Sequence, residues 1–287
     1  MAEERYPPEV VRAAFERARG PFGGMFPDHR PIFVLGPARS GTTIVGDALR
    51  LGAGIPGFHE GFLFTTAYQF LSALDERWDL IGPAIEHFGR DGAESESSRR
   101  ALSRFDYDTF RAHVLRHFHE LSTAEGEITW VAKTPDILMV HAVPMLAAAY
   151  PGARFVFVRR HGIDVIASRL RTHPEMTFTE SCRDWAAIML DWRSVRRFLG
   201  GRSFDVEQHE IARAPHTVAA TLGRWLEFDE EQSEGIARVF TTRFPARTSA
   251  RDLATPTLLS DTGWSVEQAE AFRIECGAAM DAYGYVF

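Results

Sequence analysis

Short, continuous apolar runs alternate with segments of helical periodicity along this chain of 287 residues. Runs at 31–36, 128–133 and 154–159 are typical of strands that are buried on both faces, as in a parallel sheet. A fourth strand is predicted at 203–208. Helices are predicted at 8–19, 42–51, 65–78, 108–121, 135–149, 162–171, 182–199, 215–226 and 266–283. This alternation predicts an α/β fold with a central, mainly parallel sheet flanked by helices.

No internal repeat and no long linker divides the chain, so residues 1–287 are expected to form a single domain. The stretch 62–127 is rich in aromatic and charged residues, and we expect it to be a largely helical insertion around a polar loop. Residues 238–263 show little periodicity.

Composition and charge exclude several classes of protein. The chain is 45% hydrophobic and 25% charged, which is ordinary for a globular domain. Its net charge of −7 argues against nucleic acid as a partner, and two cysteines cannot build a disulfide framework. The charged N-terminus lacks the apolar stretch of a signal peptide, and no apolar run reaches the roughly 18 residues of a membrane span. We therefore expect a cytoplasmic protein.

A glycine motif between the first strand and the next helix indicates an anion-binding loop. Gly36 and Gly41 have four residues between them, which is the spacing of a P-loop whose backbone N–H groups hold an anionic group. A nucleotide triphosphatase would have lysine next, but Thr42 and Thr43 follow, and Arg39 supplies a cation from within the loop. The pattern favours anion binding over a ligand-free turn and argues against ATP or GTP hydrolysis.

Basic residues also follow two other predicted strands. Arg160 comes at the end of the strand 154–159, and Ser168 lies eight residues later, so the two could share one phosphate. An arginine pair in surface ion pairs explains this segment equally well. Lys133 ends the strand 128–133 and is the single lysine among 32 basic residues. A GC-rich genome accounts for the many arginines, but it does not account for the place of this lysine.

Taken in order, these motifs resemble the sulfotransferases that use 3'-phosphoadenosine 5'-phosphosulfate (PAPS), especially the carbohydrate, tyrosylprotein and bacterial branches. The resemblance covers roughly residues 31–60, 128–171 and 203–228. It implies that the 5'-phosphosulfate is held by Arg39, Ser40, Gly41, Thr42 and Thr43. It also implies that Arg160 and Ser168 hold the 3'-phosphate, in a P-loop-type domain.

The resemblance further implies that Lys133 and Arg39 stabilise the transferring sulfonate and that Glu60 is the general base. His59 is a rival base, because the pKa of histidine lies nearer neutrality. The sequence departs from the family at His161 and at Gln208-His209-Glu210. The family's C-terminal basic loop is not identifiable, and the weak candidates for it are Arg243, Arg247 and Arg251.

The expected reaction is in-line transfer of a sulfonate group from PAPS to a hydroxyl, without a metal ion, and with 3',5'-bisphosphoadenosine (PAP) as product. Sugars, lipids, small molecules and peptides all fit as acceptors, and 62–127 is expected to bind the acceptor. A small-molecule P-loop kinase and a non-catalytic nucleotide-binding member of the family are the alternatives, and a homodimer is compatible with the many apolar helix positions. His113 and His117 share one helix face, but a solvated face explains them better than a metal site.

Overall fold

The computed structural model describes residues 6–58, 60, 62–87, 106–122, 127–243 and 257–287. Five strands form one sheet in the order β2-β3-β1-β4-β5, and every neighbouring pair is parallel. The strands are β1 (Ile32–Leu35), β2 (Gly57–Phe58), β3 (Val131–Lys133), β4 (Arg154–Arg159) and β5 (Ser203–Glu207). The predicted α/β fold with a parallel sheet is confirmed, and the short strand β2 is an addition to the four predicted strands.

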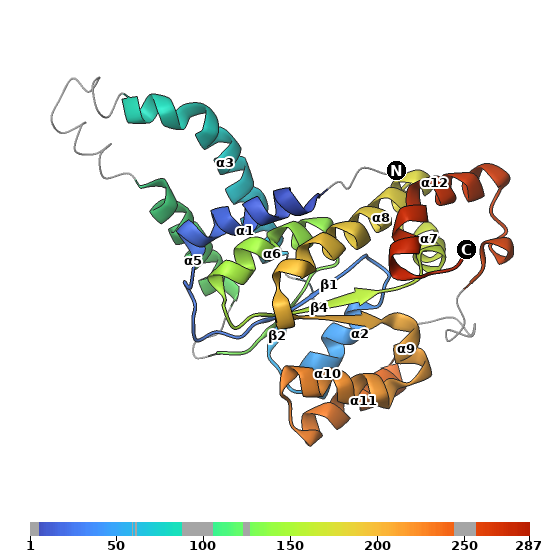
Figure 1. Ribbon diagram of the computed structural model, residues 1–287. Coiled ribbons are helices and arrows are strands. Elements are labelled where there is room, and N and C mark those ends of the chain that lie inside the picture. The colour runs from blue at the N-terminus through green and yellow to red at the C-terminus, as the bar shows by residue number, and fades with distance from the viewer. Residues whose placement is uncertain (1–5, 59, 61, 88–105, 123–126, 244–256) are drawn as a thin grey trace.

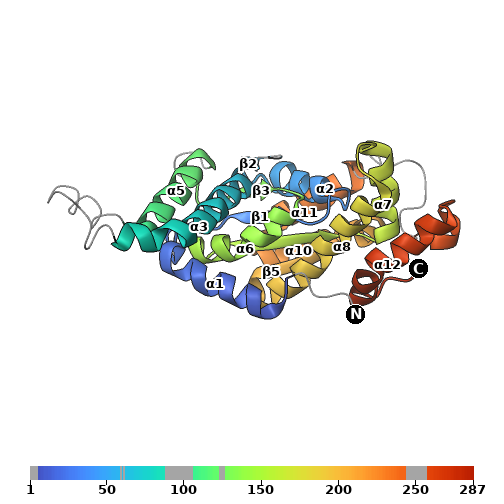
Figure 2. The same cartoon turned by 90° about the horizontal axis from the view of Figure 1, so that it is seen from above.

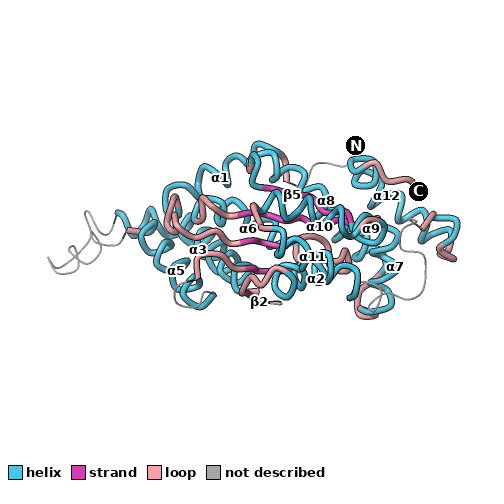
Figure 3. The backbone as a smooth tube through the Cα atoms, turned by 90° about the horizontal axis from the view of Figure 1, so that it is seen from below, coloured by secondary structure: helices cyan, strands magenta, loops and turns pink. Residues whose placement is uncertain are grey.

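Helices cover both faces of the sheet (Figure 1). The upper layer contains α1 (Pro8–Phe22), α6 (Ile137–Ala149) and α8 (Phe178–Val195). The lower layer contains α2 (Thr42–Asp47), its continuation as the π-turn η1 (Ala48–Gly52), α10 (Pro215–Leu226) and α11 (Glu230–Arg243), and Figure 3 shows it in front of the strands. The short helix α9 (Gln208–Arg213) connects β5 to α10.

The strands divide their side chains between two cores because successive residues of a strand point to opposite faces. Phe33 and Phe155 pack in the core under α1, α6 and α8. Val34 and Val156, each one position later, pack in the core against α2, α10 and α11. Burial on both faces explains why these strands appear in the sequence as continuous apolar runs.

Two groups of helices lie at opposite ends of the molecule (Figure 2). At one end lie α3 (Leu63–His87) and α5 (Tyr107–Ser122). At the other end lie α7 (Gly162–Thr172) and α12 (Val266–Tyr283). The expected helical character of 62–127 therefore holds for the parts of this stretch that the structure describes.

Several helices differ from the sequence prediction: α3 continues to His87 rather than residue 78, and α9 was not predicted. Local capping explains the differences at α8 and α11. No helix was predicted at α11, which begins after Asp229, buries Ile236 and Phe240, and overlaps the weakly periodic stretch 238–263 only in its last residues. Asp229 accepts a hydrogen bond from the backbone of Gln232, whose side chain accepts one from the backbone of Asp229. The helix α8 begins one turn earlier than predicted because Thr177 and Glu180 form a capping box.

A backbone contact between two glycines fixes α11 against η1. A Cβ atom at Gly52 would overlap the carbonyl group of Gly235, and a Cβ atom at Gly235 would overlap the carbonyl group of Gly52. Only glycine lets two backbones approach this closely. The contact holds the lower layer against the segment that continues α2.

Candidate active site

The carboxyl ends of three central strands bring the predicted site residues to one edge of the sheet. In the order of strands, β1 lies between β3 and β4. The strands β2 and β3 are added on one side of β1, and β4 and β5 on the other, so the strand order reverses at β1. Ligands of parallel α/β sheets bind at such a position. Here β1 leads into the loop Gly36–Gly41, which we call the glycine loop, while Lys133 ends β3 and Arg160 follows β4.

The glycine loop has a strained backbone that its sequence permits. Gly36 and Gly41 have φ angles of 142° and 99°, and a Cβ atom at Gly36 would overlap the carbonyl oxygen of Val158 on β4. Arg39 also has a positive φ of 73°, which is uncommon for a residue with a side chain. Strain of this kind is concentrated at ligand sites, because the surrounding structure must hold it in place.

Ser40 fastens this loop to the sheet. Its hydroxyl is buried and lies 2.6 Å from the carbonyl oxygen of Pro37 and 2.8 Å from that of Val158. Its backbone N–H also donates to Pro37. A hydroxyl has one proton to donate, so it serves these two acceptors alternately. Because both donors of Ser40 are used within the protein, its predicted contact with a ligand stays a prediction.

Lys133 and Glu60 meet beside the first turn of α2. The ammonium group of Lys133 forms an ion pair with the carboxylate of Glu60 and donates to the hydroxyl of Thr43 at 3.2 Å. The Lys133 side chain is only 1% exposed, whereas 41% of the Glu60 side chain is exposed. The lysine stem packs against Gly46 of α2. The structure therefore combines a fixed, buried cation with a carboxylate that solvent or a substrate can reach.

A second group joins the glycine loop to β4 and α7. The Nε of Arg39 donates to the hydroxyl of Ser168 at 3.1 Å, and Arg160 donates to the backbone carbonyl of Arg39 at 3.2 Å. The Nε of Arg160 is buried, and no residue that the structure describes accepts its proton. Burial lowers the pKa of Arg160, and the charges of Arg39 and Arg171 lower it further, while Asp164 acts in the opposite direction. Two guanidinium groups and one hydroxyl therefore lie together, and the Nε of Arg160 has no acceptor among the described residues.

Comparison with known protein families gives a match that includes this site. A model of the sulfotransferase family matches residues 31–232, which is more than half of the chain. The chain belongs to the sulfotransferase family. The matched range includes both groups of residues described above.

Individual relatives of this sulfotransferase-family chain are distant. An uncharacterized protein of Aquifex aeolicus is 24% identical over an alignment of 260 residues, and the match covers 86% of this chain and 31% of that protein. The chain thus spans about a third of that relative. The crystal structure of sulfotransferase STF9 from Mycobacterium avium matches with a TM-score of 0.50 and 16% identity over 90% of this chain and 78% of the other. The sulfotransferase domain from the curacin biosynthetic pathway gives a TM-score of 0.49 and 15% identity, covering 92% and 98% of the two chains.

Arg169 is a structural residue of the site that the sequence did not reveal. It is buried, and its Nε donates to the carbonyl oxygen of Ala38 in the glycine loop at 3.3 Å. Its Nη1 donates to the carbonyl oxygen of Ser181 and forms an ion pair with Asp184 at 2.6 Å. Arg169 therefore ties the loop to α8, and nothing in its sequence context separates it from the other arginines.

Two of the histidines that depart from the family pattern have structural partners. His161 contacts the carbonyl oxygen of Val286 through Nε2 at 2.8 Å, and His209 contacts Asp164 at 3.0 Å. Burial raises the pKa of Asp164, but hydrogen bonds from His209 and Thr257 outweigh it, so the net pKa is lowered. These contacts connect the end of β4 with Val286 near the C-terminus, and the helix α9 that follows β5 with α7.

Several other predicted residues lie elsewhere or outside the description. His59, Arg247 and Arg251 are outside the described residues. Arg243 lies at the end of α11, 3.5 Å from the carboxylate of Asp47. His113 and His117 are exposed on α5, which confirms the solvated helix face.

Within the described residues, no group of three or more His, Cys, Asp or Glu side chains is placed to hold a metal ion. No helix in the described part of the chain combines the length and the apolar character needed to cross a membrane.

Proposed function

We propose that the chain transfers a sulfonate group from PAPS to a hydroxyl group of an acceptor. One observation carries this proposal: the Lys133–Glu60 pair and the Arg39–Ser168–Arg160 group flank the same glycine loop. Sulfonate transfer, like phosphoryl transfer, requires alignment of the reacting groups and stabilisation of charge, and these two groups supply both. PAPS, when bound, supplies the sulfonate group that is transferred.

The phosphate-binding role of the arginine group is supported by its excess of positive charge. We propose that Arg160, through its unsatisfied Nε, and Ser168 hold the 3'-phosphate. Arg39 already lies on Ser168, so its guanidinium would move little to contact the same dianion. Backbone N–H groups of Gly41, Thr42 and Thr43, at the start of α2, would bind the 5'-phosphate.

The catalytic roles follow from the Lys133–Glu60 pair. Glu60 would accept the proton of the acceptor hydroxyl, since its carboxylate is exposed while its lysine partner is not. Lys133 would stabilise negative charge at the oxygen that departs with the leaving group, and its contact with Thr43 already directs it toward the glycine loop. A compact ammonium group suits a position shared between two oxygens better than a planar guanidinium does. Arg39 would assist in stabilising the sulfonate only after its side chain leaves the hydroxyl of Ser168, to which it now donates.

Acceptor binding by 62–127 is proposed in a narrower form. The helix α3 begins three residues after Glu60 and leads away toward the end of the molecule opposite α7 and α12 (Figure 2). Only the beginning of α3 is therefore adjacent in sequence to the proposed base. Hydroxyl groups of sugars, lipids, peptides or small molecules all remain acceptors within this proposal, and a cytoplasmic location and a homodimer remain predictions.

A thermal-shift comparison tests the donor assignment. We expect PAP without magnesium to stabilise the protein by about 2.7 kcal/mol when it is present at about 100 times its dissociation constant. ATP with magnesium should give no comparable shift, because Thr42 replaces the lysine of a nucleotide triphosphatase. Stabilisation by ATP with magnesium alone would support a kinase instead. Incubation with labelled PAPS and a broad panel of hydroxyl acceptors separates an enzyme from a member that binds without transfer.

A further inference from the structure

A cavity of about 550 Å³ opens at the amino ends of the strands, at the opposite edge of the sheet from the glycine loop. Ile32 and Arg154, the first residues of β1 and β4, form its floor together with Thr129, which precedes β3. The turn between α10 and α11 forms another wall with Phe228. The cavity shares no lining residue with the proposed donor site.

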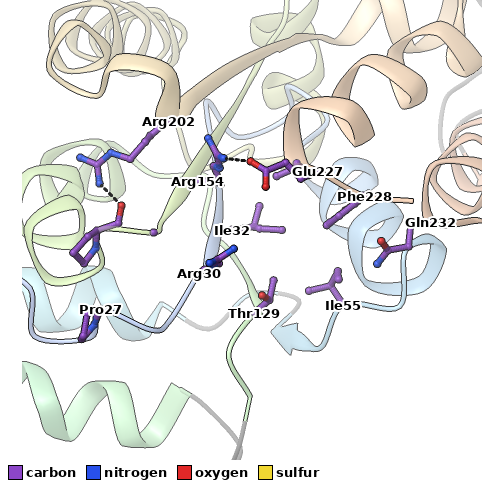
Figure 4. Close-up of a pocket in the computed structure, with 13 residues that line it drawn as sticks. Pro27, Arg30, Ile32, Ile55, Thr129, Arg154, Arg202, Glu227, Phe228 and Gln232 are labelled. Carbon is purple, nitrogen blue, oxygen red and sulfur yellow. Dashed lines mark hydrogen bonds and ion pairs between the residues drawn. The ribbon is translucent and has the colours of Figure 1, made fainter. Parts of the chain in front are cut away.

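Positive charge predominates among the residues that line this cavity. Arg30, Arg154 and Arg202 face it, and Glu227 is its single acidic lining residue. Glu227 pairs with Arg154 at 2.8 Å. Figure 4 shows the three arginines around one space, with Glu227 beside Arg154. An excess of two cations is notable in a chain whose net charge is −7.

Two of the arginines have no acidic partner among the described residues. Arg202 donates to the carbonyl oxygens of Ala147 and Pro151 at 3.1 and 3.2 Å, so its charge is not neutralised. Burial lowers the pKa of Arg202, and the positive charge of Arg154 lowers it further. Arg30 makes no side-chain hydrogen bond or ion pair with any residue in the described part of the chain. These guanidinium groups retain the capacity to bind an anion.

The opposite side of the cavity carries apolar side chains, with Thr129 and Gln232 beside them, and this determines what kind of anion fits. Ile32, Ile55 and Phe228 line this side, as Figure 4 shows. An inorganic ion would use the arginines and leave the apolar side exposed to water. A ligand with one anionic end and an apolar body would satisfy both sides.

We propose that this cavity binds a small organic anion, with its carboxylate or phosphate group at Arg30, Arg154 and Arg202 and its apolar body on Ile32, Ile55 and Phe228. The anionic group exchanges solvent contacts for guanidinium hydrogen bonds. This site is independent of the proposed function, because no residue that is proposed to bind PAPS takes part in it.

Saturation-transfer NMR tests the proposal with phenylphosphate, benzoate and the neutral analogue benzyl alcohol as probes. Each is added to the full chain with PAP in excess, so that the proposed donor site is filled. We expect phenylphosphate or benzoate to bind and benzyl alcohol to bind far more weakly. The stronger of the two anions identifies whether phosphate or carboxylate is preferred.

The variant Arg30→Gln should weaken probe binding by about tenfold or more, since a charge-assisted hydrogen bond is lost. Arg12→Gln, an exposed arginine on α1, serves as the matched control and should bind like the wild type. Equal thermal unfolding midpoints of the two variants show that folding is not the cause.

Failure of both anions to bind overturns the proposal, as do equal binding of benzyl alcohol and unchanged binding by Arg30→Gln. Probe binding that occurs only when PAP is left out overturns it as well, because the probes would then occupy the donor site. A protein that does not bind PAP contradicts the proposed function, and the comparison of Arg30→Gln with Arg12→Gln still tests this cavity.

Discussion

The two charged groups beside the glycine loop differ in how their charges are balanced. Lys133 and Glu60 form a pair with no net charge, and one partner is buried while the other is exposed. Arg39 and Arg160 lie together with Ser168, so they carry an excess of positive charge, and one buried N–H of Arg160 lacks an acceptor among the described residues. A balanced pair suits proton transfer and changing charge, whereas a positive excess suits permanent binding of a dianion. The contrast predicts that variants of the first group affect turnover and variants of the second affect donor affinity.

Glu60→Gln should have the largest effect, because it removes the proposed base and retains the size of the side chain. General-base catalysis is worth about 10²–10⁴-fold in rate, so turnover should fall by about that factor with little change in the dissociation constant of PAP. Steady-state transfer from labelled PAPS and calorimetry with PAP measure the two quantities. Glu120→Gln, an exposed glutamate on α5, is the control. Near-wild-type turnover of Glu60→Gln would remove Glu60 from the mechanism.

Lys133→Arg should lower turnover by about 10²–10³-fold, comparable to the loss of one preorganised donor in an active site. The charge is retained, but a planar guanidinium does not reproduce the compact, buried ammonium that contacts both Glu60 and Thr43. The same two assays apply, together with thermal unfolding to verify the fold. A variant with full activity would show that any cation at this position is sufficient.

Arg160→Gln should act on affinity and spare turnover at saturating donor. Loss of a charge-assisted hydrogen bond weakens PAP binding by about 10- to 100-fold. Calorimetry measures the change, and Arg224→Gln, an exposed arginine on α10, provides the control. A fall in turnover at saturating PAPS without a change in affinity would reverse the contrast between the two groups.

Asp164→Asn should have the smallest effect, on stability, with a defined dependence on pH. The pKa of Asp164 is lowered in the folded state, so its ionised form stabilises the protein above the ordinary aspartate pKa of about 3.9. Loss of the charge should destabilise the protein by about 1–3 kcal/mol at pH 7. The difference from wild type should narrow as the pH falls below about 4, which denaturant unfolding at several pH values measures.

The pKa of Glu207 is shifted in the opposite direction from that of Asp164, so its contribution to stability has the opposite dependence on pH. Burial raises the pKa of Glu207, so the folded state favours its protonated form, despite opposing contributions from Tyr285 and Arg159. The stability associated with it is present at low pH and is lost as the pH rises through the raised pKa. A difference between Asp164→Asn and wild type that widened toward low pH would contradict the lowered pKa of Asp164.

The sequence revealed the parts of the site that depend on local signals. The run 31–36 and the spacing of Gly36 and Gly41 identify a buried strand, a turn and a helix within one short segment. Lys133 and Arg160 each follow such a run, so parallel packing brings them to the same edge of the sheet. These features were predicted because strand burial and glycine spacing leave direct traces in the residue pattern.

Other parts depend on contacts between distant segments, which leave no local trace. Arg169 reaches Ala38 across 131 positions, and nothing near it distinguishes it from other arginines. The cavity at the amino edge likewise gathers residues from separate loops. The helix α11 was also not predicted, although its N-terminal capping pair, Asp229 and Gln232, is a local signal that is visible in the sequence.

The glycine contact behind α2 has a consequence for how the site keeps its shape. Gly52 and Gly235 meet backbone to backbone, so docking of α11 on η1 immobilises no side-chain rotamers at this point. Elsewhere in a protein core, neighbouring side chains can hop between rotamers, and such small rearrangements alter the distance between helices. At this point the distance is limited by direct contact between the two backbones. The helix α2 and its continuation η1, which follow the glycine loop, are therefore held against α11 by a contact that involves no side-chain rotamers.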